Sequence, residues 1–162
     1  LTMAKKTKGE DKRYIVHSDG SSLGNPGPSG YGAVVRLGDK KMTLSKGFFR
    51  STNNRMEIMS VIATLEEFGP NKRFDFYVDS SYTLDGATKW VHGWRRNNWI
   101  TRDGKPVKNK DLWIQLYELM RENSVRIFKV KGHSGVPDNE EADQLANAGS
   151  ANPTETDTGF VD

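Results

Sequence analysis

The order of hydrophobic patterns along the chain limits its possible folds more than any other feature. Three strand-like segments come first, and two more then alternate with segments of helical periodicity. The expected strands are residues 14–19, 31–37, 41–49, 74–79 and 125–130, and the expected helices are residues 53–68, 111–122 and 139–148, with shorter helical pieces within residues 80–100. Strands that alternate with helices favour parallel pairing. The order therefore predicts an α/β fold with a five-stranded mixed sheet, three antiparallel strands followed by parallel strands, flanked by helices.

Turn-forming residues separate these segments. Residues 20–30, which include Asn25-Pro26-Gly27-Pro28, predict a long turn after the first strand. Gly38-Asp39 predicts a hairpin turn, and Gly69-Pro70 ends the first helix. The chain of 162 residues has the length of one domain and no visible internal repeat.

The two ends of the chain differ in composition from the middle. We expect residues 1–13 to be a flexible basic arm, residues 14–150 to form the domain, and residues 151–162 to be an acidic polar tail. The chain has no Cys, which excludes a disulfide scaffold, a thiolate zinc site and a cysteine nucleophile. No apolar run approaches the ~18 residues of a membrane span, and the basic arm lacks the apolar part of a signal peptide. We expect a cytoplasmic monomer that does not contact a membrane.

The net charge of +3 conceals an uneven distribution. Residues 1–13 carry +3 and residues 86–110 carry +6, so the other residues together carry −6. A basic patch on an otherwise acidic protein indicates a polyanion that binds at one face. A solvated surface without a partner explains the same pattern at this point.

Four acidic residues stand at positions where carboxylates can meet. Asp19 and Asp79 end two expected strands, and ligands of open sheets collect at such strand ends. Glu57 shares the apolar face of the first long helix, and Asp143 adjoins the apolar face of the last one. Each acid alone is better explained as a turn residue or as a first-turn acid that complements the helix dipole.

If the four acids converge, their repulsion requires cations. Hard divalent ions prefer oxygen ligands, and a chain with three His and no Cys is a poor zinc site. Mg²⁺ or Mn²⁺ held by carboxylates indicates phosphoryl transfer.

Several ordered motifs resemble ribonuclease HI of the bacterial type. The resemblance extends from about Tyr14 to the Asp-Thr-Gly-Phe near the end of the chain. The motifs are Asp19-Gly20-Ser21-Ser22-Leu23-Gly24-Asn25-Pro26-Gly27-Pro28, Thr52-Asn53-Asn54-Arg55-Met56-Glu57, Val78-Asp79-Ser80, Val130-Lys131-Gly132-His133 and Glu141-Ala142-Asp143-Gln144-Leu145-Ala146. The resemblance implies a ribonuclease H-like fold for the catalytic domain over residues 14–150.

This resemblance implies an endonuclease that hydrolyses the RNA strand of RNA–DNA hybrids. Asp19, Glu57, Asp79 and Asp143 would hold two Mg²⁺ ions, with Mn²⁺ as a substitute, and the products would carry 5′-phosphate and 3′-hydroxyl ends. One ion would activate the attacking water and the other would stabilise the leaving oxygen. The resemblance gives His133 an auxiliary catalytic role, such as proton transfer or product release.

The resemblance also implies a set of substrate contacts. Hybrids are recognised by shape, phosphates and 2′-hydroxyls rather than by bases. The implied minor-groove contacts are Ser22, Asn25, Asn53, Asn54 and Ser81, and the implied pocket for a phosphate of the DNA strand is Arg50, Thr52 and Asn109. Ser81 stands where close bacterial relatives often have Gln. The serine side chain is shorter and would shorten that minor-groove contact. The Asn residues have an alternative explanation as turn and helix-cap residues.

The basic patch resembles the basic protrusion of this family. Its candidate contacts are Trp90, Trp94, Arg95 and Arg96, because Trp and Arg can stack on sugars and neutralise phosphates. The spacing of the two Trp equally permits one of them to pack into the core, which leaves the two Arg as the better contacts.

Three functions from different classes remain open. They are a hybrid-specific ribonuclease, another nuclease or strand transferase of the same fold, and a catalytically silent hybrid-binding module. The Asn-rich motifs and the basic protrusion favour the first over the second. The presence of all four acids favours it over the third.

Overall fold

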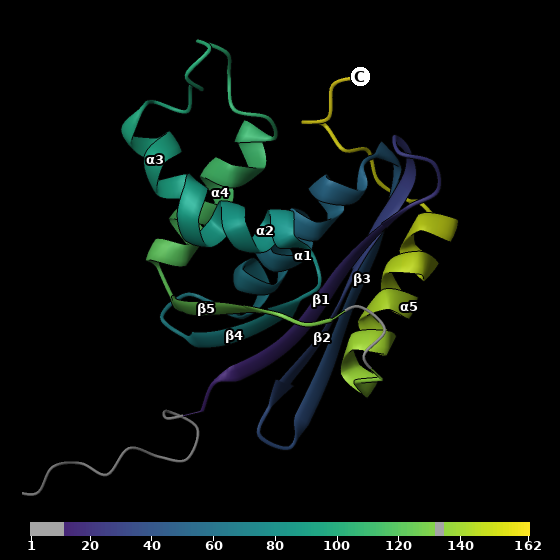
Figure 1. Cartoon of the computed structure of the whole chain (residues 1–162). Helices are drawn as coiled ribbons and strands as arrows, with labels where there is room; N and C mark the ends of the chain where they lie inside the picture. Colours follow the sequence, from purple (N-terminus) through teal and green to yellow (C-terminus); the bar gives the residue numbers. More distant parts are fainter. Residues whose placement is uncertain (1–11, 132–134) are drawn as a thin grey trace, which may run out of the picture.

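The computed structural model describes residues 12–131 and 135–162. Its five strands form one sheet in the order β3-β2-β1-β4-β5 (Figure 1). Their bounds are Tyr14–Ser22 for β1, Gly27–Leu37 for β2, Lys40–Ser51 for β3, Arg73–Val78 for β4 and Ser124–Lys129 for β5. Strands β1, β2 and β3 pair antiparallel, whereas β4 pairs parallel with both β1 and β5. The predicted five-stranded mixed sheet is confirmed.

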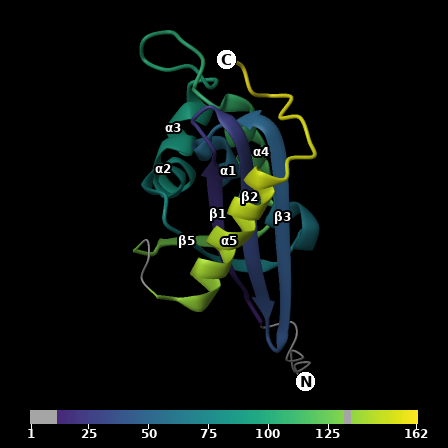
Figure 2. The ribbon, with the colours of Figure 1, turned by 90° about the vertical axis from the view of Figure 1, so that its right-hand side faces the viewer.

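Helices cover both faces of the sheet. The bounds are Asn53–Phe68 for α1, Ser81–Asp85 for α2, Gly86–Trp90 for the π-helix η1, Val91–Arg96 for α3, Lys110–Arg121 for α4 and Pro137–Ala151 for α5. In the side view, α5 lies across the strands β1, β2 and β3 on one face, while α1 and α4 lie behind the sheet (Figure 2). Among the described residues, no helix combines the length and apolar character that a membrane span requires.

The main core lies between the sheet and the pair α1 and α4. Ile58 and Leu65 of α1 are buried against Phe74 and Phe76 of β4, as the helical and alternating patterns predict. Trp113 of α4 is fully buried in the same cluster. Burial of such large apolar side chains fixes the position of α1 relative to β1 and β4. It thereby fixes the elements that carry three of the four predicted acids.

The prediction of a long turn over residues 20–30 is wrong. Strand β1 continues to Ser22 and β2 begins at Gly27, and Gly20, Ser21 and Ser22 pair with Tyr31, Gly30 and Ser29. The turn itself covers only residues 23–26. Small polar residues indicated a loop, but the antiparallel ladder satisfies their backbone groups and overrides that preference.

The last helix also differs at its ends from the prediction. Helix α5 begins at Pro137 instead of residue 139, since proline lacks a backbone N–H and suits the first helical turn.

After α5 the chain returns along β3, where the backbone N–H groups of Thr154 and Glu155 donate to the Gly47 carbonyl at 3.1 and 3.0 Å. Phe49 N donates to the Glu155 carbonyl at 2.9 Å, so residues 154–155 are attached to the edge of the sheet.

Candidate active site

Three carboxylates meet where β1 and β4 run side by side. Asp19 lies in β1, Asp79 directly follows β4, and Glu57 lies in the second turn of α1. One carboxylate oxygen of each lies within 4.8 Å of the others. A Cβ at position 20 would lie 2.6 Å from the Glu57 backbone nitrogen, so only glycine there lets β1 approach α1 this closely. Gly20 is a positional requirement that the sequence interpretation did not single out.

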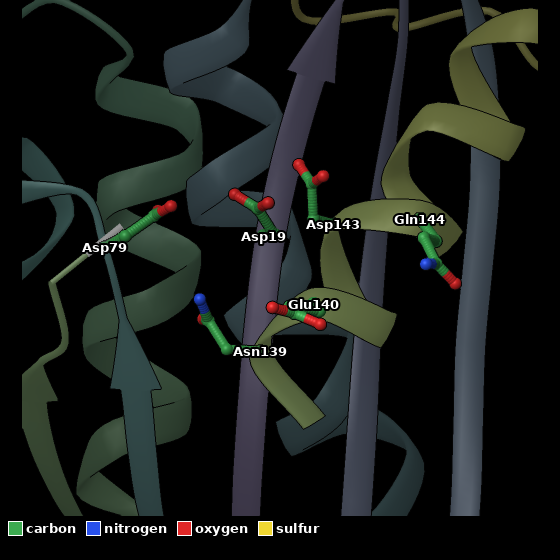
Figure 3. Close-up of a pocket in the computed structure, with 6 residues that line it drawn as sticks. All are labelled: Asp19, Asp79, Asn139, Glu140, Asp143 and Gln144. Carbon is green, nitrogen blue, oxygen red and sulfur yellow. The ribbon is translucent and has the colours of Figure 1, made fainter. Parts of the chain in front are cut away.

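The fourth predicted acid approaches from the opposite layer. Asp143 projects from α5 beside Asp19 and, with Asp19 and Asp79, lines a pocket of about 220 Å³ (Figure 3). It is not part of the three-carboxylate cluster, although it shares this pocket. The sheet therefore supplies two acids, and one helix from each face supplies another. Asp19, Asp79 and Asp143 thus share one crevice, and Glu57 adjoins it through its cluster with Asp19 and Asp79.

Burial and nearby negative charge raise the pKa of two acids of this cluster, Asp19 and Glu57. Burial, opposed by the contact with Glu57 and reinforced by the charge of Asp79, raises the pKa of Asp19 to about 7. Burial and the nearby Asp19 carboxylate raise the pKa of Glu57 well above its usual value. The protein alone thus favours the protonated forms of Asp19 and Glu57, and a bound cation would favour their ionised forms.

The residues present fit a hard divalent metal ion. Glu57 is 3% exposed, and its Oε2 atom has no hydrogen-bond partner among the residues that the structure describes. A buried carboxylate oxygen without a partner is costly unless a cation or proton satisfies it. Asp19, Glu57, Asp79 and Asp143 offer oxygen atoms only, which is the donor set that Mg²⁺ and Mn²⁺ prefer.

The pocket has further polar walls that the sequence interpretation missed. Asn139, Glu140 and Gln144 of α5 line it together with the acids (Figure 3). Asn139 is 7% exposed, which is low for an amide in a first helical turn. Its place two residues after Pro137 could have marked the start of the helix, but no periodic pattern indicated that it faces the acids. The predicted auxiliary residue His133 lies outside the described residues.

A second pocket collects half of the predicted phosphate and minor-groove residues. Its volume is about 630 Å³, and Asn25, Thr52, Asn54 and Asn109 all line it. The Asn25 side chain accepts a hydrogen bond from Asn53 N at 3.0 Å, which joins the β1–β2 turn to the start of α1. Thr52 is the N-cap of α1 and accepts from Arg55 N at 3.2 Å. The cap residue is therefore Thr52, and the amide side chains of Asn53 and Asn54 do not perform that role.

Asn109 is held in this second pocket by two neighbours. Its amide nitrogen donates to the Tyr82 hydroxyl at 3.1 Å, and its amide oxygen accepts from Arg55 Nη1 at 3.4 Å. Tyr82 also accepts from Trp113 Nε1 at 3.3 Å. Tyr82 and Arg55 thus orient a predicted phosphate contact, and sequence spacing gave no signal for either role.

The remaining predicted substrate contacts, Ser22, Ser81 and Arg50, are not among the residues that line these two pockets. The Ser22 hydroxyl donates to the Gly24 carbonyl and accepts from Ser29 Oγ, the latter at 2.9 Å. Ser81 begins α2 and accepts a hydrogen bond from Lys129 Nζ at 2.6 Å. Arg50 lies near the end of β3, where its guanidinium binds the side chain of Asp162.

The basic patch is divided between packing and exposure. Trp94 packs on the buried Trp113 with ring centroids 5.6 Å apart, whereas Trp90 is 42% exposed. The Arg95 guanidinium lies over the Tyr117 ring at 5.3 Å, and Arg96 is exposed. The expectation that at least one Trp packs inward is confirmed for Trp94.

Comparisons with known proteins agree on one family. A family model described as RNase H matches residues 11–151. A curated relative named Ribonuclease H from Escherichia coli (strain K12 / DH10B) is 45% identical over 149 residues, which covers 92% of this chain and 96% of the relative. A curated Ribonuclease H from Shigella boydii serotype 18 (strain CDC 3083-94 / BS512) has the same identity and coverage.

Solved structures show the same fold. The crystal structure of LC9-RNase H1, described as a type 1 RNase H with the type 2 active-site motif, has a TM-score of 0.79 at 31% identity. The match covers 93% of this chain and 77% of that one. LC11-RNase H1 in complex with RNA/DNA hybrid has a TM-score of 0.65 at 20% identity, with 86% of this chain and 97% of that one covered.

Proposed function

The chain belongs to the ribonuclease H family, as an enzyme of the bacterial type, and we propose that it hydrolyses the RNA strand of RNA–DNA hybrids by a two-metal mechanism. One observation carries the proposal. Three carboxylates from three separate elements place their oxygens within 4.8 Å of one another, and one buried Glu57 oxygen has no partner among the described residues. Such a cluster is unfavourable without cations and suits two of them.

The four acids perform the metal-binding part of this mechanism. Asp19, Glu57, Asp79 and Asp143 would hold two Mg²⁺ ions, or Mn²⁺ in their place. When bound, these ions supply Lewis-acid activation of the attacking water and of the leaving 3′ oxygen. Because water attacks the phosphate directly, no protein nucleophile is required, and the products carry 5′-phosphate and 3′-hydroxyl ends.

The chain's own residues prepare the site for this chemistry. Asp19 is protonated at pH values below its pKa of about 7, and this proton must leave when the carboxylate becomes a metal ligand. Glu57 is fixed by its burial at the start of α1, so its free oxygen needs little reorganisation. Asp143 would close the site from the α5 side, and His133 would assist proton transfer or product release.

The second pocket would hold the hybrid beside the acids. Asn25, Asn53 and Asn54 can donate to and accept from the minor groove, with Ser22 and Ser81 nearby. A phosphate of the DNA strand would bind Arg50, Thr52 and Asn109. The exposed Trp90, Arg95 and Arg96 would contact the backbone further along the duplex, while Trp94 mainly supports them by packing. A LC11-RNase H1 structure with bound hybrid supports this substrate class.

One cleavage assay tests the proposal against the alternatives. Labelled RNA–DNA hybrid, double-stranded DNA, double-stranded RNA and single-stranded RNA are each incubated with the protein, with Mg²⁺ or with a chelator. We expect cleavage only of the RNA strand of the hybrid, and only in the samples that contain Mg²⁺. Cleavage or joining of DNA would instead identify a strand-processing enzyme of the same fold. Hybrid binding without cleavage under any divalent ion would identify a silent module.

A further inference from the structure

Arg50, one of the proposed phosphate contacts, binds a carboxylate of its own chain. Arg50 Nε donates to both carboxylate oxygens of Asp162 at 3.0 and 2.9 Å, and Nη2 donates to Oδ1 at 2.6 Å. Hydrogen bonds from the guanidinium lower the pKa of Asp162, so this carboxylate stays ionised at neutral pH. Both side chains are more than half exposed, so a ligand from solvent can reach them.

The path of the chain before Asp162 is fixed by buried contacts. Asp157 is 7% exposed and accepts hydrogen bonds from Ser51 Oγ at 2.6 Å and from Arg55 Nε at 2.7 Å. A Cβ at Gly159 would lie 2.0 Å from Asp111 Oδ2, so the chain passes directly over the Arg55–Asp111 ion pair. Phe160 N donates to the Asp157 carbonyl at 3.2 Å. Two residues beyond this anchor, Asp162 reaches Arg50.

The same segment forms one wall of the second pocket. Gly159, Phe160 and Val161 line that pocket together with Thr52 and Asn109. In both ribbon views the end of the chain lies near the turn between β1 and β2 and near the loop that precedes α4 (Figures 1 and 2). Asp162 therefore adds a negative charge at the margin of the pocket in which a phosphate would bind.

We propose that Asp162 occupies the phosphate-binding edge of Arg50, so that hybrid binding requires the exchange of this carboxylate for a phosphate of the DNA strand. The proposal rests on the proposed function, because it takes Arg50 to be a phosphate contact. Carboxylate and phosphate both bind the guanidinium fork through two parallel hydrogen bonds, so one can replace the other. An exposed ion pair is weak, and a phosphate with further contacts to the pocket can displace it.

The exchange makes Asp162 a determinant of substrate affinity. An incoming phosphate must break the Arg50–Asp162 contact and approach a negative charge, and both effects weaken binding. A phosphate that gains only the Arg50 contact profits less from the exchange than one that also engages Thr52 and Asn109. Asp162 thus favours a duplex that fits the whole pocket over a polyanion that meets Arg50 alone.

The test is a double-mutant cycle between Arg50 and Asp162 in the whole chain. Binding of a labelled RNA–DNA hybrid is measured by fluorescence anisotropy in the presence of a chelator, which prevents cleavage. We expect Asp162→Asn to lower Kd by a factor of about two to five, the range typical of one exposed ion pair. Arg50→Ala should raise Kd, and adding Asp162→Asn to Arg50→Ala should change it little. With Mg²⁺, Asp162→Asn should lower KM and leave kcat unchanged.

A matched control separates a local effect from a change in net charge. Glu141→Gln removes a carboxylate from the Lys41–Glu141 ion pair, which is 2.6 Å long and also partly exposed. An equal fall in Kd with Glu141→Gln, or an undiminished fall with Asp162→Asn in the Arg50→Ala background, would overturn the inference. An unchanged Kd with Asp162→Asn while Arg50→Ala weakens binding would also overturn it. An unchanged Kd with Arg50→Ala would instead refute the phosphate contact in the proposed function.

Discussion

Arg55 and Glu57 lie two positions apart in helix α1. Both side chains are buried among acidic residues, but with opposite results. Arg55 lies between Asp111 and Asp157, and its guanidinium donates to both carboxylates at 2.6 to 3.1 Å. Glu57 has a carboxylate oxygen within 4.8 Å of oxygens of Asp19 and Asp79, and its Oε2 atom has no partner among the described residues. The first cluster supplies its own cation, whereas the second consists of acids alone. The Arg55 cluster therefore stabilises the fold, whereas the Glu57 cluster is suited to bind cations.

The pKa shifts of the two clusters record this difference. Although burial alone would raise it, hydrogen bonds from Arg55 and Ser51 lower the pKa of Asp157 below its usual value. In the other cluster burial and neighbouring acids raise the pKa of Asp19 to about 7. Burial therefore has opposite consequences, depending on whether the fold provides a positive charge.

The largest expected effect is the loss of cleavage when one acid of the Glu57 cluster is replaced. Asp19→Asn removes a charged ligand and should lower the cleavage rate by a factor on the order of 10³ or more, while hybrid binding stays largely intact. Asp79→Asn should act in the same way. Asp39→Asn, in the exposed turn between β2 and β3, is the control for charge. Normal cleavage by Asp19→Asn protein would refute the site assignment.

The second effect concerns the Arg55 cluster and stability instead of chemistry. Arg55→Ala leaves Asp157 buried without its cation and should lower the free energy of unfolding by about 3 kcal/mol. Urea unfolding with a chelator measures this loss, and Arg55→Lys, which keeps the charge, should lose less. The control is Arg36→Ala, because the Arg36–Asp138 pair is exposed. An equal loss in Arg36→Ala would remove the distinction between the clusters.

A third effect is a pH dependence of stability with opposite signs in the two clusters. The folded pKa of Asp19 lies above its unfolded value of about 3.9, so its contribution is complete below that value and is lost as pH rises towards 7. The folded pKa of Asp157 is lowered, so its contribution is present above pH ~4 and is lost as the pH falls further.

Unfolding experiments without metal can separate these two slopes. Asp19→Asn should reduce the loss of stability between about pH 4 and 7, to which Glu57 also contributes, and make the metal-free protein more stable at pH 8 by on the order of 2 kcal/mol. Mg²⁺ should stabilise the unsubstituted protein at pH 8 and have much less effect on the Asp19→Asn variant. If the variant shows the same slope as the parent, Asp19 does not carry the raised pKa.

The acids could be predicted from the sequence because their positions follow from local rules. Asp19 lies in β1 and Asp79 directly follows β4, two strands that pair in parallel, and Glu57 shares the apolar face of a helix with clear periodicity. Gly69-Pro70 marked the end of that helix correctly. Local pattern determines which face and which end of an element a residue occupies, whereas the shared role of the four acids was predicted only from the family resemblance.

The Arg55 cluster could not be predicted in this way because its partners are distant in the sequence. Asp157 and Asp111 meet Arg55 only after α4 and the C-terminal segment have packed against the start of α1. The polar composition of residues 151–162 suggested a tail, and nothing local indicated that Asp157 would be buried. Ion pairs between elements depend on tertiary packing, which periodicity does not describe.

The smallest expected effect distinguishes the two acids that share Arg55. The side chain of Asp157 is 2% exposed, whereas that of Asp111 is 47% exposed, although each accepts a hydrogen bond shorter than 2.8 Å from the guanidinium. Water can replace the lost partner at Asp111, so Asp111→Asn should lower the free energy of unfolding by less than about 1 kcal/mol. Asp157→Asn should cost several times more, because Arg55 and Ser51 lose a buried acceptor. Urea unfolding of both variants at pH 7 gives the comparison, and equal losses would show that burial does not set the strength of this ion network.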